Sequence, residues 1–225
     1  MNKYIKVLGI FVLMIFSFYY TEKVALYVQN NTPLKKEIIS YKEKNSINFV
    51  NAQIDGDYIV PGINGLEVNV DKSYDKMKSY NVFSENNLIY DQITPEVSVT
   101  NYKNKIIKSG NVNKNAVSII LSKNNKNIKY FKENNIVYDL LTKTNYCIKS
   151  HFSSCSKTGK QVVEPTINFT NLLFLKQLKN ITKGCIIYID DDLAVEYIRI
   201  LINYIKYNNL NILNLNNHLS EYYQP

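Results

Sequence analysis

Three consecutive carboxylates, Asp190, Asp191 and Asp192, form the densest acidic cluster in the sequence. They follow an apolar run, 184–189, that is typical of a buried strand, and they precede a segment with helical periodicity. Carboxylates at the carboxyl end of a strand are well placed to bind a hard cation, so Asp190 and Asp192 are candidate metal ligands. The alternative is structural, because acidic residues at a helix N-terminus satisfy free N–H groups and match the helix dipole.

Two histidines and three cysteines are the other groups that could bind a metal. Cys147, His151 and Cys155 recur at every fourth position, which would bring them to one face of a helix, and zinc accepts both side chains. A structural zinc site normally has four ligands, however, and Cys185 lies in an apolar run where a small buried hydrophobe is expected. A disulfide between Cys147 and Cys155, or free thiols, are the alternatives. His218 follows the last expected strand, where a capping or surface position is predicted.

The formal net charge of +8 does not by itself indicate a nucleic-acid partner. The lysines are scattered and Arg199 is the single arginine, whereas a nucleic-acid-binding surface normally concentrates basic residues, arginine among them, in a stripe. The sequence also lacks a glycine-rich phosphate loop and the G-x-S-x-G and H-E-x-x-H motifs of hydrolases. We therefore expect no nucleic-acid partner.

Residues 1–28 are predicted to be a transmembrane anchor that contacts the membrane through residues 5–20. Lys3 and Lys6 precede an uncharged run, and Tyr19 and Tyr20 follow it where aromatic rings prefer the membrane interface. Residues 4–20 reach the lower limit of about 17 residues for a spanning helix. The basic residues place the N-terminus in the cytoplasm and the rest of this single-pass chain outside.

Two alternatives to an anchor fit the same residues less well. A cleaved signal peptide would have an apolar core of similar length, but the segment 17–23 lacks a small-x-small cleavage site. A buried core helix would normally have a polar face, and this run has none.

The remaining sequence predicts three parts. Residues 29–52 are polar and are predicted to be a stalk. Residues 53–115 alternate polar and apolar positions between turn residues, which is typical of a small α+β domain, and the orientation of the predicted anchor makes this domain extracytoplasmic. Residues 116–225 alternate strands and helices, so this part is predicted to be an α/β domain.

Within the α/β part, two helices have a recognisable apolar face. Leu172, Leu175 and Leu178 mark one face of the first. The second, 191–208, is the clearest helix of the sequence, and its apolar face comprises Ala194, Ile198, Leu201, Ile202 and Ile205. It lies between the expected strands 184–189 and 210–215, which are therefore predicted to be adjacent and parallel.

Several segments resemble membrane-anchored members of the polysaccharide deacetylase family from low-GC bacteria. They are Val60-Pro-Gly-Ile-Asn-Gly-Leu-Glu-Val68 and the segments 17–23, 71–78, 106–111 and 117–121. Lys183-Gly-Cys-Ile-Ile-Tyr-Ile189 and the segment 210–221 are similar to the last strand, helix and strand of the family's NodB-homology domain. The resemblance implies a small extracellular domain ahead of a (β/α) barrel, and glycan deacetylation at a divalent metal in active members.

The departures from the family pattern concern its catalytic groups. The family's first motif is a strand that ends in two aspartates, but the equivalent strand here, Val117-Ser-Ile-Ile-Leu-Ser-Lys123, has no carboxylate. The second motif, His-x-x-x-His, is absent because His151 and His218 are far apart. The interval 117–147 is also too short for the usual helices and strands. The expected fold is therefore a reduced and incomplete NodB-like barrel, and no catalytic residue is predicted.

The leading hypothesis is a non-catalytic, extracytoplasmic protein without a cofactor that binds a cell-wall glycan or an envelope protein. The alternative is an active deacetylase in which Asp190, Asp192, His151 or His218 hold zinc, whose bound water hydrolyses the N-acetyl C–N bond. A third interpretation is the product of a decaying gene.

Overall fold

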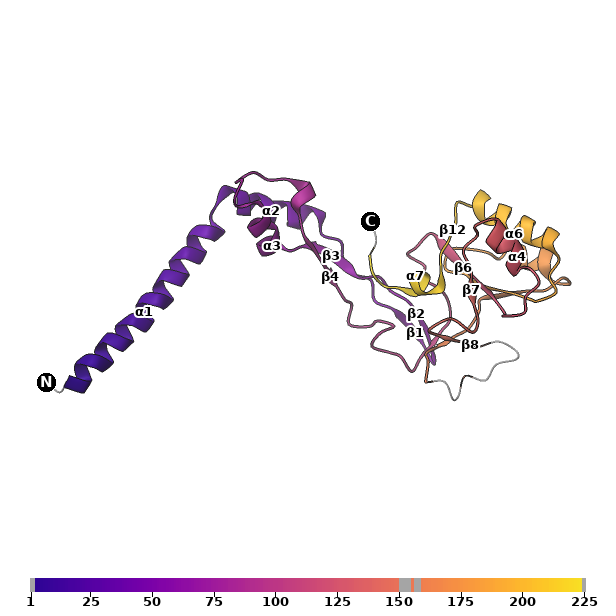
Figure 1. The fold of residues 1–225 in the computed structure, drawn as a ribbon, viewed down its shortest axis with the longest axis horizontal. Coiled ribbons are helices and arrows are strands. Elements are labelled where there is room, and N and C mark those ends of the chain that lie inside the picture. The colour runs from indigo at the N-terminus through magenta and orange to yellow at the C-terminus, as the bar shows by residue number, and fades with distance from the viewer. Residues whose placement is uncertain (1–2, 150–154, 156–158, 224–225) are drawn as a thin grey trace. The chain divides into compact units, whose positions relative to one another are not determined.

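The computed structural model describes residues 3–149, 155 and 159–223 (Figure 1). They divide into two compact units. Unit 1 comprises Met1–Ile47 and Leu66–Asp91, and unit 2 comprises Asn48–Gly65 and Gln92–Pro225.

Unit 1 begins with the long helix α1, Lys3–Asn30. Its stretch Val7–Ala25 is 19 residues long with a mean hydropathy of 1.5, which is long and apolar enough to cross a membrane. No part of this stretch is buried against the rest of the described structure, so the interpretation as a core helix does not apply.

The rest of unit 1 folds around a small apolar cluster. Helix α2, Pro33–Asn45, is capped by Thr32, and helix α3, Val70–Met77, is capped by Asn69. The other elements of this region are strand β3, Gly65–Val68, the short helix η1, Glu85–Asn87, and strand β4, Tyr90–Ile93, which pairs with β3. Leu34, Ile38, Val68, Met77 and Leu88 form the buried cluster. Residues 29–52 therefore differ from the predicted polar stalk, because α2 buries one face.

A parallel sheet is the centre of unit 2. Its middle strand is β6, Ala116–Leu121, which is buried at every position. Strand β11 pairs with one edge of β6, and the short strands β12 and β7 pair with its N-terminal and C-terminal parts at the other edge. Strand β10 lies beyond β11. The bounds are Asp139–Leu140 for β7, Ile167–Phe169 for β10, Ile186–Ile189 for β11 and Asn211–Ile212 for β12.

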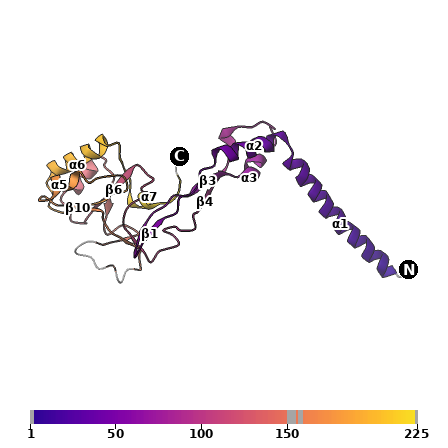
Figure 2. The same ribbon diagram turned by 180° about the vertical axis from the view of Figure 1, so that it is seen from behind.

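Three helices cover one face of this sheet (Figures 1 and 2). They are α4, Ile128–Glu133, α5, Phe174–Leu178, and α6, Val195–Tyr207. The apolar face predicted for α6 is confirmed in four of its five positions, Ile198, Leu201, Ile202 and Ile205, which are all buried. Their side chains pack with alternate residues of β6 and β11 in the largest apolar cluster of the described structure.

A second sheet packs on the other face of the parallel sheet. It has the order β1-β2-β5-β9-β8. Its Ile59, Ile107 and Val163 form a core with Ile120 of β6 and Ile186 of β11, to which helix α7, Leu215–Leu219, also contributes. Unit 2 thus has three layers: helices, parallel sheet and second sheet. The bounds are Gln53–Asp55 for β1, Tyr58–Val60 for β2, Ile106–Ile107 for β5, Cys147–Ile148 for β8 and Val162–Val163 for β9.

Several predictions about this fold are corrected by the structure. Strands β11 and β12 are parallel but not adjacent, because β6 lies between them. In α5 the buried residue is Phe174, and Leu178 packs against the same core. Leu175 is 70% exposed, and Leu172, which precedes the helix, is 96% exposed. The described strands form open sheets, so the mixed α/β class is confirmed and the reduced, incomplete barrel is not.

The domain boundary predicted at 115/116 also differs from the compact units. Strand β5 precedes that boundary, yet it pairs with β9, which follows it. A cut at residue 115 would therefore pass through a sheet, and residues 48–65 and 92–115 belong to unit 2.

Candidate functional site

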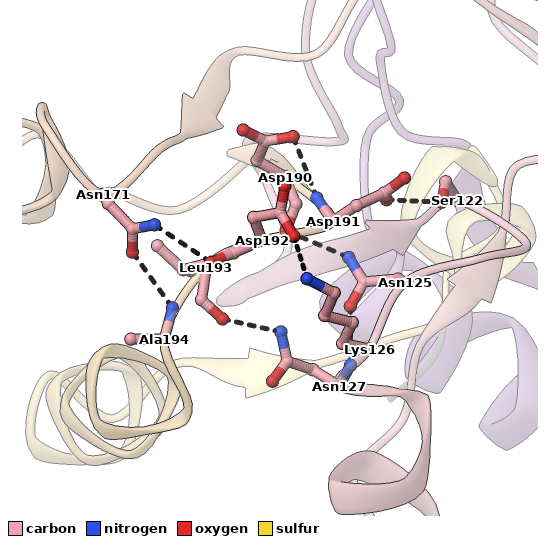
Figure 3. Close-up of polar contacts among 10 residues, drawn as sticks. All are labelled: Ser122, Asn125, Lys126, Asn127, Asn171, Asp190, Asp191, Asp192, Leu193 and Ala194. Atoms are coloured by element: carbon pink, nitrogen blue, oxygen red, sulfur yellow. Dashed lines mark hydrogen bonds and ion pairs between the residues drawn. The ribbon is translucent and has the colours of Figure 1, made fainter.

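The carboxyl ends of β6, β10 and β11 meet at one edge of the parallel sheet, which is where α/β folds usually bind ligands. The loops that follow these strands supply the residues drawn in Figure 3. They include the Asp190–Asp192 cluster, so the predicted metal ligands do lie at the expected edge.

The three carboxylates of this cluster are engaged in bonds inside the loops. Asp191 Oδ1 accepts a hydrogen bond from the Ser122 hydroxyl. Asp192 Oδ1 forms an ion pair with Lys126 Nζ, and both of these side chains are largely exposed. Asp190 Oδ1 accepts from the backbone N–H of Asp191 at 2.9 Å. Figure 3 shows the carboxylates directed to these different partners rather than converging on one point.

Asparagine side chains fix the backbone of the same loop. Asn125 Nδ2 donates to the carbonyls of Ile189 and Asp190 at 3.0 and 3.1 Å, and its Oδ1 accepts from the Asn127 N–H at 2.9 Å. Asn127 Nδ2 donates in turn to the Leu193 carbonyl at 2.9 Å. Both asparagines are buried, so these bonds satisfy backbone groups that water could not reach.

The capping role proposed for the acidic cluster is wrong. Helix α6 begins at Val195, with Ala194 as its N-cap residue and no hydrogen bond from a side chain at that position. Asn171 supports the helix start instead. Its Oδ1 accepts from the Ala194 N–H and its Nδ2 donates to the Asp192 carbonyl, both at 3.0 Å.

His218 is buried, which corrects the prediction of a capping or surface position. Its ring is 0% exposed, and Nδ1 lies 3.1 Å from the Ser118 hydroxyl on β6. The ring packs so closely on Gly110 that a Cβ there would lie 2.1 Å from His218 Cε1. Burial, and next the nearby charge of Lys114, lower the pKa of His218 to about 4.

These surroundings do not fit a catalytic metal. Asp191 and Asp192 are bound to Ser122 and Lys126, and His218 is enclosed between Ser118 and Gly110. The part of the chain that the structure describes has no group of three or more His, Cys, Asp or Glu side chains that could hold a metal ion. His151, the remaining candidate, lies outside the described residues.

Cys147 and Cys155 form a disulfide in the structure, with their Cα atoms 5.7 Å apart. The sequence left three alternatives open for this pair: a disulfide, free thiols or zinc ligands. The structure contains the disulfide. Cys185 is a free, buried cysteine at the start of the β11 region, and its Sγ accepts from the Thr182 N–H. This agrees with the small buried hydrophobe expected there.

Sequence reasoning missed the asparagines and Ser118. Asn125, Asn127 and Asn171 are three among many asparagines in this chain, and their residue type gave no signal that they bind backbone groups. Ser118 is the one polar residue in the apolar run of β6, and that contrast could have indicated a buried polar partner.

Comparison with known proteins identifies solved structures of similar fold and a protein that is similar in sequence over part of this chain. No protein-family model matches the chain. The uncharacterised protein YlxY of Bacillus subtilis is 34% identical over 91 residues, which is 40% of this chain. The matched part spans only 28% of YlxY.

Three solved structures similar to this chain are of BA3943, described as a CE4 family pseudoenzyme. The wild-type protein, from Bacillus anthracis, aligns with 85% of this chain and with 96% of the BA3943 chain. The TM-score is 0.52 and the sequence identity is 17%. A BA3943 mutant described as having restored enzymatic activity matches with the same TM-score, over 99% of its chain. The chain thus has the fold of CE4 pseudoenzymes, and the predicted resemblance to a non-catalytic deacetylase is confirmed at the level of the fold.

We predict that Asn125→Ala lowers the free energy of unfolding by about 2 kcal/mol, because it leaves the Ile189 and Asp190 carbonyls and the Asn127 N–H without their partner. The matched control is Lys126→Ala, which removes an exposed ion pair and should cost less than about 1 kcal/mol. Chemical denaturation measures both. Equal effects of the two substitutions would contradict the assigned role of Asn125.

We also predict that the protein loses stability as the pH falls from about 6.5 to about 4. The folded protein keeps His218 neutral down to about pH 4, whereas an unfolded histidine titrates near 6.5, so the unfolded state binds more protons in this window. The loss attributable to His218 is on the order of 3 kcal/mol. It is measured as the difference in pH dependence between the native protein and His218→Gln, and identical pH profiles would contradict the buried, neutral imidazole.

Proposed function

We propose that this chain is a non-catalytic, membrane-anchored protein of the bacterial envelope that binds a cell-wall glycan or an envelope protein through a deacetylase-like fold. The proposal rests on the side-chain contacts at the carboxyl edge of the parallel sheet, where a deacetylase would hold its metal. Its carboxylates are bound to Ser122, Lys126 and a backbone N–H, and its loops are held by asparagines. Similarity to the fold of a CE4 pseudoenzyme supports the same conclusion.

Metal-dependent deacetylation needs two groups that this edge does not offer among the described residues. A metal must lower the pKa of a bound water, and a base within hydrogen-bond reach must take the proton. Asp191 and Asp192 would have to leave Ser122 and Lys126 before they could bind an ion. Binding without turnover is the function that this arrangement supports best.

Three observations support an extracytoplasmic location. The stretch Val7–Ala25 can cross a membrane by length and composition. The Cys147–Cys155 disulfide is typical of proteins outside the reducing cytoplasm. Lys3 and Lys6 ahead of the apolar stretch favour a cytoplasmic N-terminus.

We predict that the full-length chain, supplied with zinc or cobalt, releases no acetate from N-acetylglucosamine oligomers above the rate in buffer. The reason is that no described cluster of side chains can hold the metal that would activate water. Acetate release is measured in an enzyme-coupled assay. Turnover that is abolished by a chelator, and by His151→Ala or Asp192→Asn, would establish the active deacetylase instead.

We predict that the protein fractionates with membranes and resists carbonate extraction, because the uncharged stretch buries enough apolar surface in the bilayer. Phe16→Lys should weaken this retention, since a lysine at the centre of a spanning helix costs about 3 kcal/mol. Ile39→Lys, outside the span, is the control and should not. A soluble chain that begins near Val24 would show a cleaved signal peptide.

A further inference from the structure

Unit 2 contains a pocket of about 230 Å³ on the side of the fold formed by its C-terminal segment. Residues 219–222 form one wall, and Asn64, Tyr146 and the loop 94–100 form the others. None of the residues of the Asp190–Asp192 edge lines this pocket. It is therefore distinct from the edge where a deacetylase would hold its metal.

The walls of the pocket are fixed by Glu221. This residue is 8% exposed, and its two carboxylate oxygens accept from the backbone N–H groups of Gly62 and Val99, each at 3.0 Å. Its backbone carbonyl accepts from the Asn64 N–H at 2.7 Å. Glu221 thus joins three segments of unit 2 around the pocket, namely 62–64, the loop that contains Val99 and its own C-terminal segment.

Asn64 carries the main argument for a ligand. It is only 5% exposed and lines the pocket, yet its Oδ1 is buried without a hydrogen-bond partner. Within the described residues its Nδ2 makes no hydrogen bond either. Buried side-chain amides are nearly always paired, so a bound molecule can supply the missing partner once a rotation of the Asn64 side chain brings its amide to the pocket.

The chemistry of the lining selects a neutral ligand. The pocket has no lysine, arginine or histidine in its walls and includes the Glu221 carboxylate, which repels anions. Tyr146, Thr94 and Thr100 present hydroxyl groups. Burial, and next the charge of Glu221, raise the pKa of Tyr146, so its hydroxyl keeps its proton and can donate.

The volume of the pocket and the residues that line it favour a ligand with a single ring. Sites for drug-sized molecules usually measure about 300–1,000 Å³, and this pocket is smaller. Val99 and Leu219 give it an apolar part. Tyr222 is 63% exposed and lines the pocket, where its flat apolar ring can lie against a ring of similar size.

We propose that this pocket binds one neutral sugar unit of a wall glycan, with the Asn64 amide paired to an acetamido or hydroxyl group and the Tyr146 hydroxyl donating to the same ring. The inference rests on the proposed function, because it assigns the glycan-binding role to a particular site. It involves binding alone and no bond to the sugar is broken.

The test measures binding of free sugars to the full chain in phospholipid nanodiscs, since sugar-based detergents would compete. Saturation-transfer NMR with N-acetylglucosamine and glucose should show binding of at least one, and the anionic glucuronate should bind more weakly. Asn64→Leu should weaken binding at least tenfold, and Tyr146→Phe several-fold. Asn168→Leu is the matched control: Asn168 also has a buried unpaired Oδ1, but it lies on β10 and does not line the pocket.

Stability separates a ligand-binding role of Asn64 from a structural one. Asn64→Leu removes a polar group without a partner, so the unfolding midpoint should be unchanged or raised. A lowered midpoint together with lost binding would show a structural role and overturn the proposal. Absence of binding by all the sugars, or equal losses in Asn64→Leu and Asn168→Leu, would also overturn it.

Sedimentation with purified cell-wall sacculi distinguishes failure of the pocket from failure of the proposed function. Wall binding that Asn64→Leu leaves intact would overturn the pocket and leave a wall-binding function standing. Sugar binding that depends on Asn64, without any wall binding, would support the pocket and contradict the wall glycan as its source. Loss of both activities in Asn64→Leu, with Asn168→Leu unaffected, is the expected result.

Discussion

Strand β6 is paired at both edges and buried on both faces, and the rest of unit 2 is built around it. Val117, Ile119 and Leu121 pack under the helices, while Ile120 faces the second sheet. A strand so enclosed can carry a polar group only where the group finds a partner, because an unpaired buried polar group is unfavourable. Ser118 meets that condition by contacting His218, which in turn helps to hold the C-terminal segment.

The same requirement explains how the described side chains at the carboxyl edge of the sheet are used. Asn125, Asn127 and Asn171 replace water as partners of the loop backbone, so the loops that follow β6, β10 and β11 are cross-linked to one another. Asp191 and Asp192 take part in the same connections. Groups that hold a loop together are not available to move a proton or bind an ion without breaking it. The fold is therefore compatible with the absence of catalytic groups among the described residues of this edge. The apolar core maintains the fold, and the polar side chains of the edge stabilise its loops.

The elements that could be predicted from the sequence are those that depend on apolar periodicity. The sequence located α1, β6, β11 and the buried face of α6, because each is a long run with one pattern. It placed β12 beside β11 because strand order depends on which edges pair, and that is decided by tertiary packing. The start of α6 was placed too early because Asn171, from a distant segment, supports it in place of the acidic cluster. The burial of His218 could not be read from its neighbours, since its contacts Ser118 and Gly110 are about a hundred residues away in sequence.

We infer that the described residues of this deacetylase-like fold form no catalytic metal site. Isothermal titration of the full-length chain with zinc tests it directly, with Asp190→Asn, Asp192→Asn, His151→Ala and His218→Gln as variants. We expect no stoichiometric site of micromolar or tighter affinity, and the same weak, non-saturating heats for the native chain and every variant. Binding of one equivalent of zinc by the native chain, lost in Asp192→Asn and in His151→Ala, would contradict it.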